Sequence, residues 1–141
     1  MKYTLTDKVK VIDGVTLHRI KALRSFGNVN AGDLGGWVEK KANLSQDGDA
    51  WVYGDAWVFG DARVSGDAWV AENAKVYGDA RVFGDAWVYG NAKVYGDAWV
   101  CGDAWLFGDA WVSGDARVSE PKTTKPWSRD NEPGNFPKKK K

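Results

Sequence analysis

A six-residue phrase, V-x-G-D-A-x, repeats from Ala50 to Ser119 and limits what this chain can fold into. Each repeat contains one aliphatic residue, and an alanine stands two positions before it. Side chains two apart on an extended strand point to the same side, so these two residues form one apolar face. The aliphatic positions are Val52, Val58, Val64, Val70, Val76, Val82, Val88, Val94, Val100, Leu106, Val112 and Val118.

The corners between these short strands are Gly-Asp or Gly-Asn pairs, in which Glu72 is the only replacement of the Gly. Gly, Asp and Asn tolerate the left-handed backbone conformation that a tight corner requires. A strand of about four residues with such a corner predicts a continuous coil, whose turns stack as parallel strands roughly 4.8 Å apart. Upstream, Val38, Ala42 and Leu44 keep the spacing, and 45–49 is predicted to be a corner loop with two extra residues.

Over residues 38–119 this pattern resembles the hexapeptide-repeat left-handed β-helix family, in which three hexads make one triangular coil. The resemblance implies an all-β, single-stranded left-handed parallel β-helix, a triangular solenoid of about 4–5 coils. Residues eighteen apart then lie above one another. The left hand follows from the resemblance alone, since the general rule for parallel crossovers predicts the opposite hand.

The sequence divides into three parts. Residues 1–37 are expected to form an N-terminal cap, in which 8–23 make a β-hairpin that turns at Asp13-Gly14. Residues 38–119 form the β-helix. Residues 120–141 are rich in Pro and Lys and are expected to form a flexible basic tail, whose Trp127 and Phe136 are available to cover the last coil.

The cap and linker segment, from Leu17 to Gly48, looks like the N-terminal region of hexapeptide proteins common in phages and prophages, including relatives named as acetyltransferases. The net charge of +1 is unevenly distributed, with ten acidic and five basic residues in 51–119 but three and seven in 120–141. A single cysteine, Cys101, excludes an intramolecular disulfide. With no long apolar run, we expect no membrane contact and a cytoplasmic protein, in the host cell if the chain is phage-encoded.

Three outward faces follow from the eighteen-residue period. The first face carries an inner row of tryptophans and an outer row beside it, namely Trp51, Trp69, Trp87 and Trp105 with Tyr53, Ala71, Tyr89 and Phe107. The second face carries Trp57, Lys75, Lys93 and Trp111 with Phe59, Tyr77, Tyr95 and Ser113. The third face carries Arg63, Arg81, Trp99 and Arg117 with Ser65, Phe83, Cys101 and Ser119.

The first face has three interpretations: rings that stabilise one another by stacking, an oligomer interface, or a platform for a small ligand. The basic residues Arg63, Arg81 and Arg117 offer forked donors to a phosphate or an acidic patch, but pairing with corner Asp residues is the favoured interpretation. For the corner row we favour side-chain hydrogen bonds to the turn backbone over a calcium site or DNA mimicry. This row comprises Asp55, Asp61, Asp67, Asn73, Asp79, Asp85, Asn91, Asp97, Asp103, Asp109 and Asp115.

Acyltransferases of the resembled family generally use a histidine as general base, and its carbonic anhydrases need three around zinc. Here the only histidine, His18, falls in the cap, and Cys101 has no base near it in the repeat. We therefore expect no enzyme activity, no catalytic residue, no cofactor and no metal site.

The leading hypothesis is a non-catalytic, phage-type β-helical scaffold that forms a dimer or trimer. It would bind a host macromolecule or a small ligand through its aromatic and basic faces. An extension of this hypothesis is that the protein counteracts a host defence system. A divergent acyltransferase that uses His18 is the first alternative. The second is a nucleic-acid-binding protein that uses the basic tail and the aromatic ladder.

Overall fold

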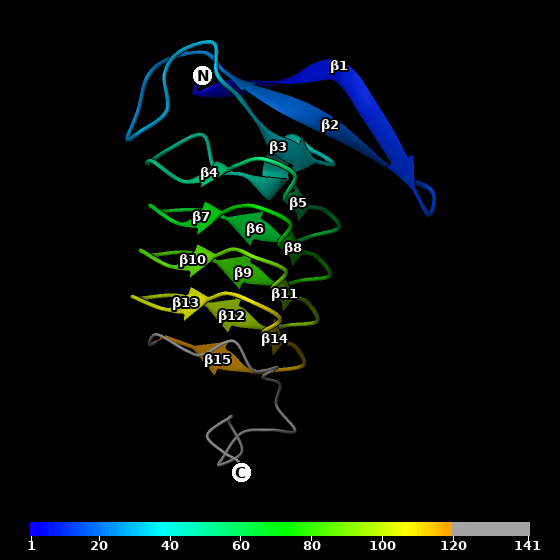
Figure 1. Ribbon diagram of the computed structural model, residues 1–141, viewed down its shortest axis with the longest axis vertical. Helices are drawn as coiled ribbons and strands as arrows, with labels where there is room; N and C mark the ends of the chain where they lie inside the picture. The colour runs from blue at the N-terminus through cyan, green and yellow to red at the C-terminus, as the bar shows by residue number, and fades with distance from the viewer. Residues whose placement is uncertain (120–141) are drawn as a thin grey trace.

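The chain begins with a long antiparallel hairpin that lies across one end of a stack of coils (Figure 1). The computed structural model describes residues 1–119. Strands β1 (Tyr3–Ile12) and β2 (Val15–Ala22) pair in antiparallel register and are joined by Asp13-Gly14. Both turn residues have positive φ, 51° and 83°, as a two-residue hairpin turn requires. The predicted hairpin and its turn are confirmed, although the first strand begins at Tyr3 rather than at residue 8. The predicted tail at 120–141, with Trp127 and Phe136, lies outside the described residues.

Strand β3 (Leu34–Val38) links the hairpin to the coils, because it pairs antiparallel with β2 and parallel with β5. A 3₁₀ turn, η1 (Lys41–Asn43), follows it. The remaining strands are two residues long and recur every six residues. They are β4 (Trp51–Val52), β5 (Trp57–Val58), β6 (Arg63–Val64), β7 (Trp69–Val70), β8 (Lys75–Val76), β9 (Arg81–Val82), β10 (Trp87–Val88), β11 (Lys93–Val94), β12 (Trp99–Val100), β13 (Trp105–Leu106), β14 (Trp111–Val112) and β15 (Arg117–Val118).

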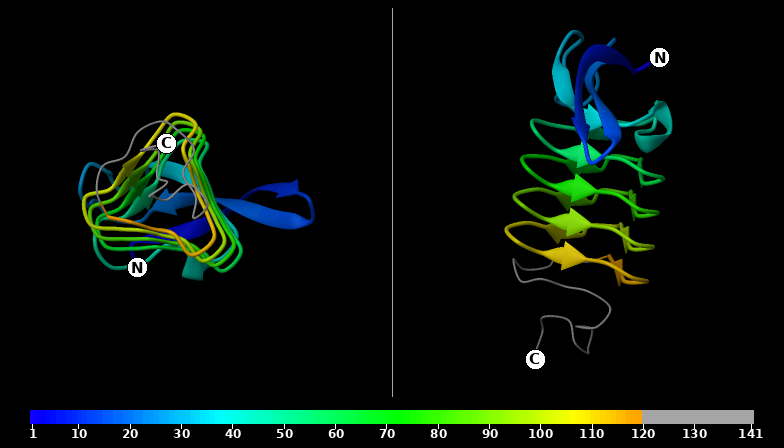
Figure 2. Two further views of the ribbon diagram at one scale, coloured as in Figure 1. Left: turned by 90° about the horizontal axis from the view of Figure 1, so that it is seen from below. Right: turned by 90° about the vertical axis from the view of Figure 1, so that its right-hand side faces the viewer.

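These strands form three parallel sheets around a triangular cross-section, which Figure 2 shows along the coil axis. The first face is the sheet β4-β7-β10-β13, and the third is β6-β9-β12-β15. The second continues from the cap as β1-β2-β3-β5-β8-β11-β14. Register partners are eighteen residues apart, as in Trp69 with Trp87, so the predicted β-solenoid is confirmed with about five turns. The hand of the coil stays a prediction from the resemblance.

Alanine and aliphatic side chains fill the interior of the coil. From Ala50 to Val118 the alanine and aliphatic positions of the repeat are at most 1% exposed, as the alternation predicts. Burial of this apolar surface is the main favourable contribution to folding, at about 25 cal/mol per Å². Because the interior is filled by small side chains from every rung, any binding or chemistry has to take place on the outer faces.

The corners are held together by the backbone rather than by the Asp side chains. The amide of Asp61 donates to the carbonyl of Gly78 at 2.9 Å, and the same bond recurs at Asp79 with Gly96. Among the described residues, no corner carboxylate accepts a hydrogen bond from its own turn, so the predicted Asp chemistry is wrong. The parallel ladder continues through each corner and gives the amide a partner one coil further on, which leaves the carboxylates exposed.

Lys2 and Tyr3 close the N-terminal end of the coil. The buried ammonium of Lys2 donates to the carbonyls of Ala50 at 2.8 Å and Gly48 at 3.2 Å. The Tyr3 hydroxyl donates to the carbonyl of Leu44 at 2.6 Å. These donors satisfy carbonyl groups that the first coil would otherwise leave unpaired, which is the function predicted for a cap.

Candidate ligand-binding groove on the third face

The third face presents a column of basic and aromatic side chains. Arg63 pairs in register with Arg81, Arg81 with Trp99, and Trp99 with Arg117. All four side chains are exposed, Trp99 by 36%. The order predicted for this face is therefore correct. Residue alternation explains it, since the residue before each buried Val must point outward.

A hollow of about 560 Å³ lies on this face below η1. The 3₁₀ turn supplies its upper wall, where Lys41 adds a further positive charge. A second hollow continues along the strands past the corner carboxylates. The residues that line both are Ala42, Arg63, Arg81 and Trp99. The repeat did not reveal this groove, because its wall comes from the irregular turn upstream of the repeat.

Arg117 and Phe83 hold Trp99 in place. The Arg117 guanidinium lies 4.1 Å from the centre of the Trp99 ring and donates to the carbonyls of Asp115 at 3.0 Å and Asp97 at 3.2 Å. Phe83 meets the same ring edge-on, with ring centres 5.8 Å apart. A cation over an indole face contributes roughly 0.5–1 kcal/mol at an exposed site. Trp99 is therefore an ordered ring at one end of the groove.

The predicted pairing of the arginines with corner Asp residues is wrong. Within residues 1–119 one ion pair is formed, between Lys40 and Asp61 at 3.1 Å. Arg117 uses backbone carbonyls instead of carboxylates, and neither Arg63 nor Arg81 forms an ion pair with a described residue. The groove thus contains two cationic side chains on neighbouring rungs with no anion paired to either in this part of the chain.

The aromatic ladder of the first face is one ring shorter than predicted. Trp69, Trp87 and Trp105 are stacked, with ring centres 4.8 Å and 5.6 Å apart. Trp51 is the backbone partner of Trp69, but it is 1% exposed and meets Tyr3 and Phe26 edge-on. The prediction that Trp51 belongs to the exposed ladder is wrong, because the cap covers it.

The outer row of the first face is interrupted at Ala71. Tyr89 and Phe107 are stacked at 5.5 Å below it. Tyr53, above it, is tilted by 56° against Trp69 at a centre-to-centre distance of 5.4 Å. Burial raises the pKa of Tyr53, and the charge of Asp49 adds to the effect. The predicted row therefore exists below Ala71, whereas Tyr53 at its upper end packs against Trp69.

On the second face, lysine ammonium groups lie over tryptophan rings. Lys75 lies 4.5 Å from the centre of the Trp57 ring, and Lys10, from the hairpin, lies 4.2 Å from that of Trp37. Trp37 is 4% exposed, and its indole N–H has no hydrogen-bond partner in residues 1–119. Sequence reasoning missed Trp37, although its position one residue before Val38 repeats the Trp-Val pair of the later coils. A shallow hollow of about 450 Å³ lies lower on this face, beside Lys75, Lys93 and Trp111.

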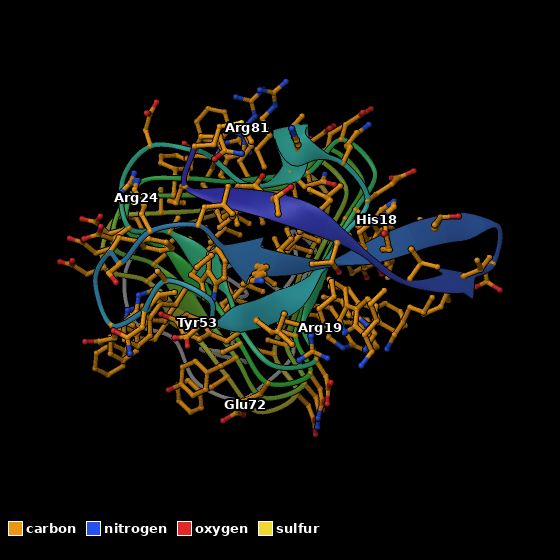
Figure 3. The ribbon with its side chains drawn as sticks, turned by 90° about the horizontal axis from the view of Figure 1, so that it is seen from above. His18, Arg19, Arg24, Tyr53, Glu72 and Arg81 are labelled. Atoms are coloured by element: carbon orange, nitrogen blue, oxygen red, sulfur yellow. The ribbon has the colours of Figure 1, made fainter. Side chains whose placement is uncertain are left out.

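His18 and Cys101 lie on different elements of the fold, and neither is in hydrogen-bond contact with the other. His18 lies on β2, and its Nδ1 is 3.2 Å from the carbonyl oxygen of Thr6. In Figure 3 it projects on the hairpin side, away from Arg81. Cys101 is a partly exposed free thiol on the third face. Within 1–119 no three His, Cys, Asp or Glu side chains form a metal-binding group, and no helix is long and apolar enough to cross a membrane.

Comparisons with known proteins identify a matching family model and a distant relative. The family described as YdcK Beta solenoid repeat matches residues 74–90 and 86–102. The protein named "Uncharacterized acetyltransferase YdcK" of Escherichia coli (strain K12) is 35% identical over 60 residues, which are 37% of this chain and 18% of that protein. The phage-type part of the resemblance stays a prediction. The matched repeat, this relative and the three stacked sheets together fit a β-helix family of the hexapeptide-repeat kind.

Proposed function

We propose that this chain is a non-catalytic binding module whose third-face groove takes a short acidic segment of a partner protein. The supporting observation is the register pair Arg63 and Arg81, which places two exposed guanidinium groups on adjacent strands. Like charges directly opposite each other destabilise a sheet. A carboxylate bound between them would remove this repulsion, and its two oxygens match the forked donors of a guanidinium.

The charges around the groove favour a short acidic segment over a nucleic-acid strand. Asp61, Asp79 and Asp97 line one edge of the lower hollow, beside the arginine column. An extended phosphate backbone would run past these carboxylates and be repelled by them, whereas a segment of a few residues would stay between the two arginines. Trp99 would offer its ring to an apolar or aromatic side chain of the same segment.

Fluorescence anisotropy with a labelled short peptide that contains two glutamates and one phenylalanine tests this proposal. We expect saturable binding that weakens at least about tenfold in the double variant Arg63→Gln plus Arg81→Gln. The matched control, Lys8→Gln plus Lys21→Gln, removes the same charge from exposed sites on the hairpin and should bind as the unaltered protein does. Equal binding by both double variants would refute the groove as the site.

A single-stranded DNA 20-mer serves as the competing probe in the same assay. Tighter binding to DNA than to the peptide, lost when Lys138, Lys139, Lys140 and Lys141 are replaced by Gln, would favour the nucleic-acid alternative. Affinity for the peptide that depends on Arg63 and Arg81 would support the proposal. Host-directed binding by a phage-type protein, including action against a defence system, is the widest form of the proposal and rests on the sequence resemblance.

Acetyl transfer is the second candidate function, because the E. coli relative is named as an acetyltransferase. In this chain the candidate base, His18, stands on β2 beside the Thr6 carbonyl rather than at the groove. Turnover of acetyl-CoA by the purified protein, lost in His18→Ala and kept in Lys21→Ala, would establish the enzyme and overturn the proposal. Absence of turnover across a panel of amine acceptors agrees with a binding module.

Self-association as a dimer or trimer is the second part of the proposal. Trp105 and Trp111 stand on successive strands around one corner and are 42% and 44% exposed. Exposed indoles of this size on two successive strands are uncommon on a monomer surface and mark contact sites. A second copy that covered them would bury apolar area while leaving the groove of the third face open.

A further inference from the structure

One aromatic ring is missing from the outer row of the first face, at the coil that contains Ala71. On the second face the corresponding row, Phe59, Tyr77 and Tyr95, is continuous, with ring centres 5.0 Å and 5.1 Å apart and nearly parallel rings. On the first face Ala71 stands where that row has a ring. The second face thus shows, within the same molecule, the position that a ring at this rung would take.

The gap at Ala71 has room for one planar ring. Adjacent rungs of a sheet are about 4.8 Å apart, so the rungs above and below Ala71 are separated by roughly 10 Å. Stacked or offset rings are stable at centre-to-centre distances of about 4.5–7 Å. The hollow measures about 310 Å³. Its lining residues are Trp69, Ala71, Glu72, Trp87, Val88 and Tyr89.

The walls of this hollow are ordered before a ligand arrives. Tyr89 is held from below by its stack with Phe107, and Trp69 is held by its stack with Trp87. Tyr53 rests against Trp69 on the other side. Rings that are already fixed lose little conformational entropy on binding, which favours a small planar ligand.

The charge around the hollow selects a cation. Glu72 is exposed at the corner directly after Ala71, and Figure 3 shows it on the same side of the molecule as Tyr53, opposite Arg81. The strands and following corners of this face, residues 50–56, 68–74, 86–92 and 104–110, contain no Lys or Arg. The negative faces of the Trp and Tyr rings add to the attraction for a positive group.

The geometry points to a binding slot at Ala71 for a planar aromatic ring that carries a cationic amine. The ring continues the stack above Tyr89, and the amine faces the carboxylate of Glu72. This slot lies on a different face from the arginine groove and is independent of the function proposed for that groove.

Tryptamine is a suitable probe, because it combines an indole ring with an ammonium group. Titration followed by isothermal calorimetry and by the indole N–H signals in NMR spectra should give saturable binding. Indole-3-acetate, with the same ring and a negative charge, should bind at least about tenfold more weakly. Equal affinity for the two compounds, or no binding of tryptamine at millimolar concentration, would overturn the proposal.

Filling the slot provides the sharpest variant. Ala71→Tyr supplies the missing ring and should abolish tryptamine binding while the melting temperature stays the same or rises, whereas Ala71→Ser should bind within about twofold of the unaltered protein. Tyr89→Ala removes the stacking surface and should also lose binding, which keeps the test valid if Ala71→Tyr fails to fold. Unchanged binding in either variant would refute the site.

Two further variants separate this slot from the groove. Glu72→Gln keeps the side-chain oxygen but removes the charge, so the preference for tryptamine over indole-3-acetate should fall. Arg63→Gln plus Arg81→Gln should leave tryptamine binding unchanged. Loss of tryptamine binding in the arginine variant would place the ligand in the groove and overturn the assignment to Ala71.

Discussion

The carboxylate of Glu72 accepts a hydrogen bond of 2.9 Å from the backbone N–H of Gly90, one coil below it. Glu72 occupies a corner position that glycine fills in the other hexads of the repeat, and its φ is +62°. A left-handed conformation costs a residue with a Cβ about 1–2 kcal/mol. The hydrogen bond to Gly90 offsets part of this cost.

Glu72→Ala should therefore be less stable than Glu72→Gly by about 1 kcal/mol, because both variants lose the hydrogen bond but only alanine keeps the strained Cβ. Urea denaturation followed by circular dichroism measures the difference. Gly66 stands at another corner with φ +66° and serves as the comparison. Gly66→Ala should lose at least as much stability relative to the unaltered protein, since the added Cβ would lie 3.0 Å from the Gly84 nitrogen. Equal stability of the Ala and Gly variants at position 72 would show that the corner carries no strain.

Two tryptophans of the first face should differ sharply in their contribution to stability. Trp51 is 1% exposed and packs against Tyr3 and Phe26, whereas Trp105 is 42% exposed at the other end of the ladder. Trp51→Ala should lower the free energy of unfolding by about 3–5 kcal/mol, and Trp105→Ala by about 1 kcal/mol. Similar losses for both would mean that the cap does not cover Trp51 in solution.

The architecture could be predicted because the repeat leaves little choice. A buried Val and Ala two residues apart fix which side of every strand faces inward, and the eighteen-residue period fixes which side chains are neighbours. The three face lists consequently match the register pairs, as Lys75 with Lys93 on the second face illustrates. Leu44 pairs with Val64 at a spacing of twenty, as the predicted two-residue insertion requires.

Interactions that depend on residues outside the repeat could not be predicted in this way. Trp51 has the same sequence context as Trp69, and only the cap residues Tyr3 and Phe26 distinguish their environments. The groove at Arg63 depends on η1, for which the spacing offered no signal. The prediction for the corner Asp residues failed for a different reason. Their backbone N–H groups donate to carbonyls of the next coil, so the usual hydrogen bonds from the turn to the Asp side chain do not form within residues 1–119.

Lys2 should make stability rise with pH in a defined window. Burial, followed in size by the charge of Arg24, lowers its pKa from 10.5 to about 8 in the folded chain. Between these two values the unfolded chain binds the proton and the folded chain does not, so stability increases as the pH rises. Below about 8 both states are protonated and Lys2 adds no slope.

Urea denaturation of the unaltered protein and of Lys2→Met, between about pH 7.5 and 9.5, checks this slope. Lys2→Met should show a smaller increase, and it should also be less stable by about 1–3 kcal/mol at pH 7 because three backbone carbonyls lose their donor. The upper limit avoids the opposing contribution of Tyr3, whose pKa is raised by burial, so that its stabilisation is lost above about pH 10. Parallel curves for Lys2→Met and the exposed control Lys8→Met would contradict the assignment.

The mass of the protein in solution should depend on Trp105 and Trp111 rather than on the upper part of the ladder. Both side chains are more than two-fifths exposed, whereas Trp69 and Trp87 are partly buried in their stack. Trp105→Ala plus Trp111→Ala should convert a dimer or trimer into a monomer, measured by light scattering after size-exclusion chromatography.

Trp69→Ala plus Trp87→Ala removes the same number of indoles and serves as the control. This double variant should keep the mass of the unaltered protein, because the slot at Ala71 must stay open to solvent if it binds an aromatic amine. Conversion to a monomer by this second pair would make the ladder an interface between copies and would close the slot. An interface built on two large indoles should have a Kd of roughly 10 μM or below. A monomeric mass for the unaltered protein at a concentration of about 100 μM would therefore remove self-association from the proposal.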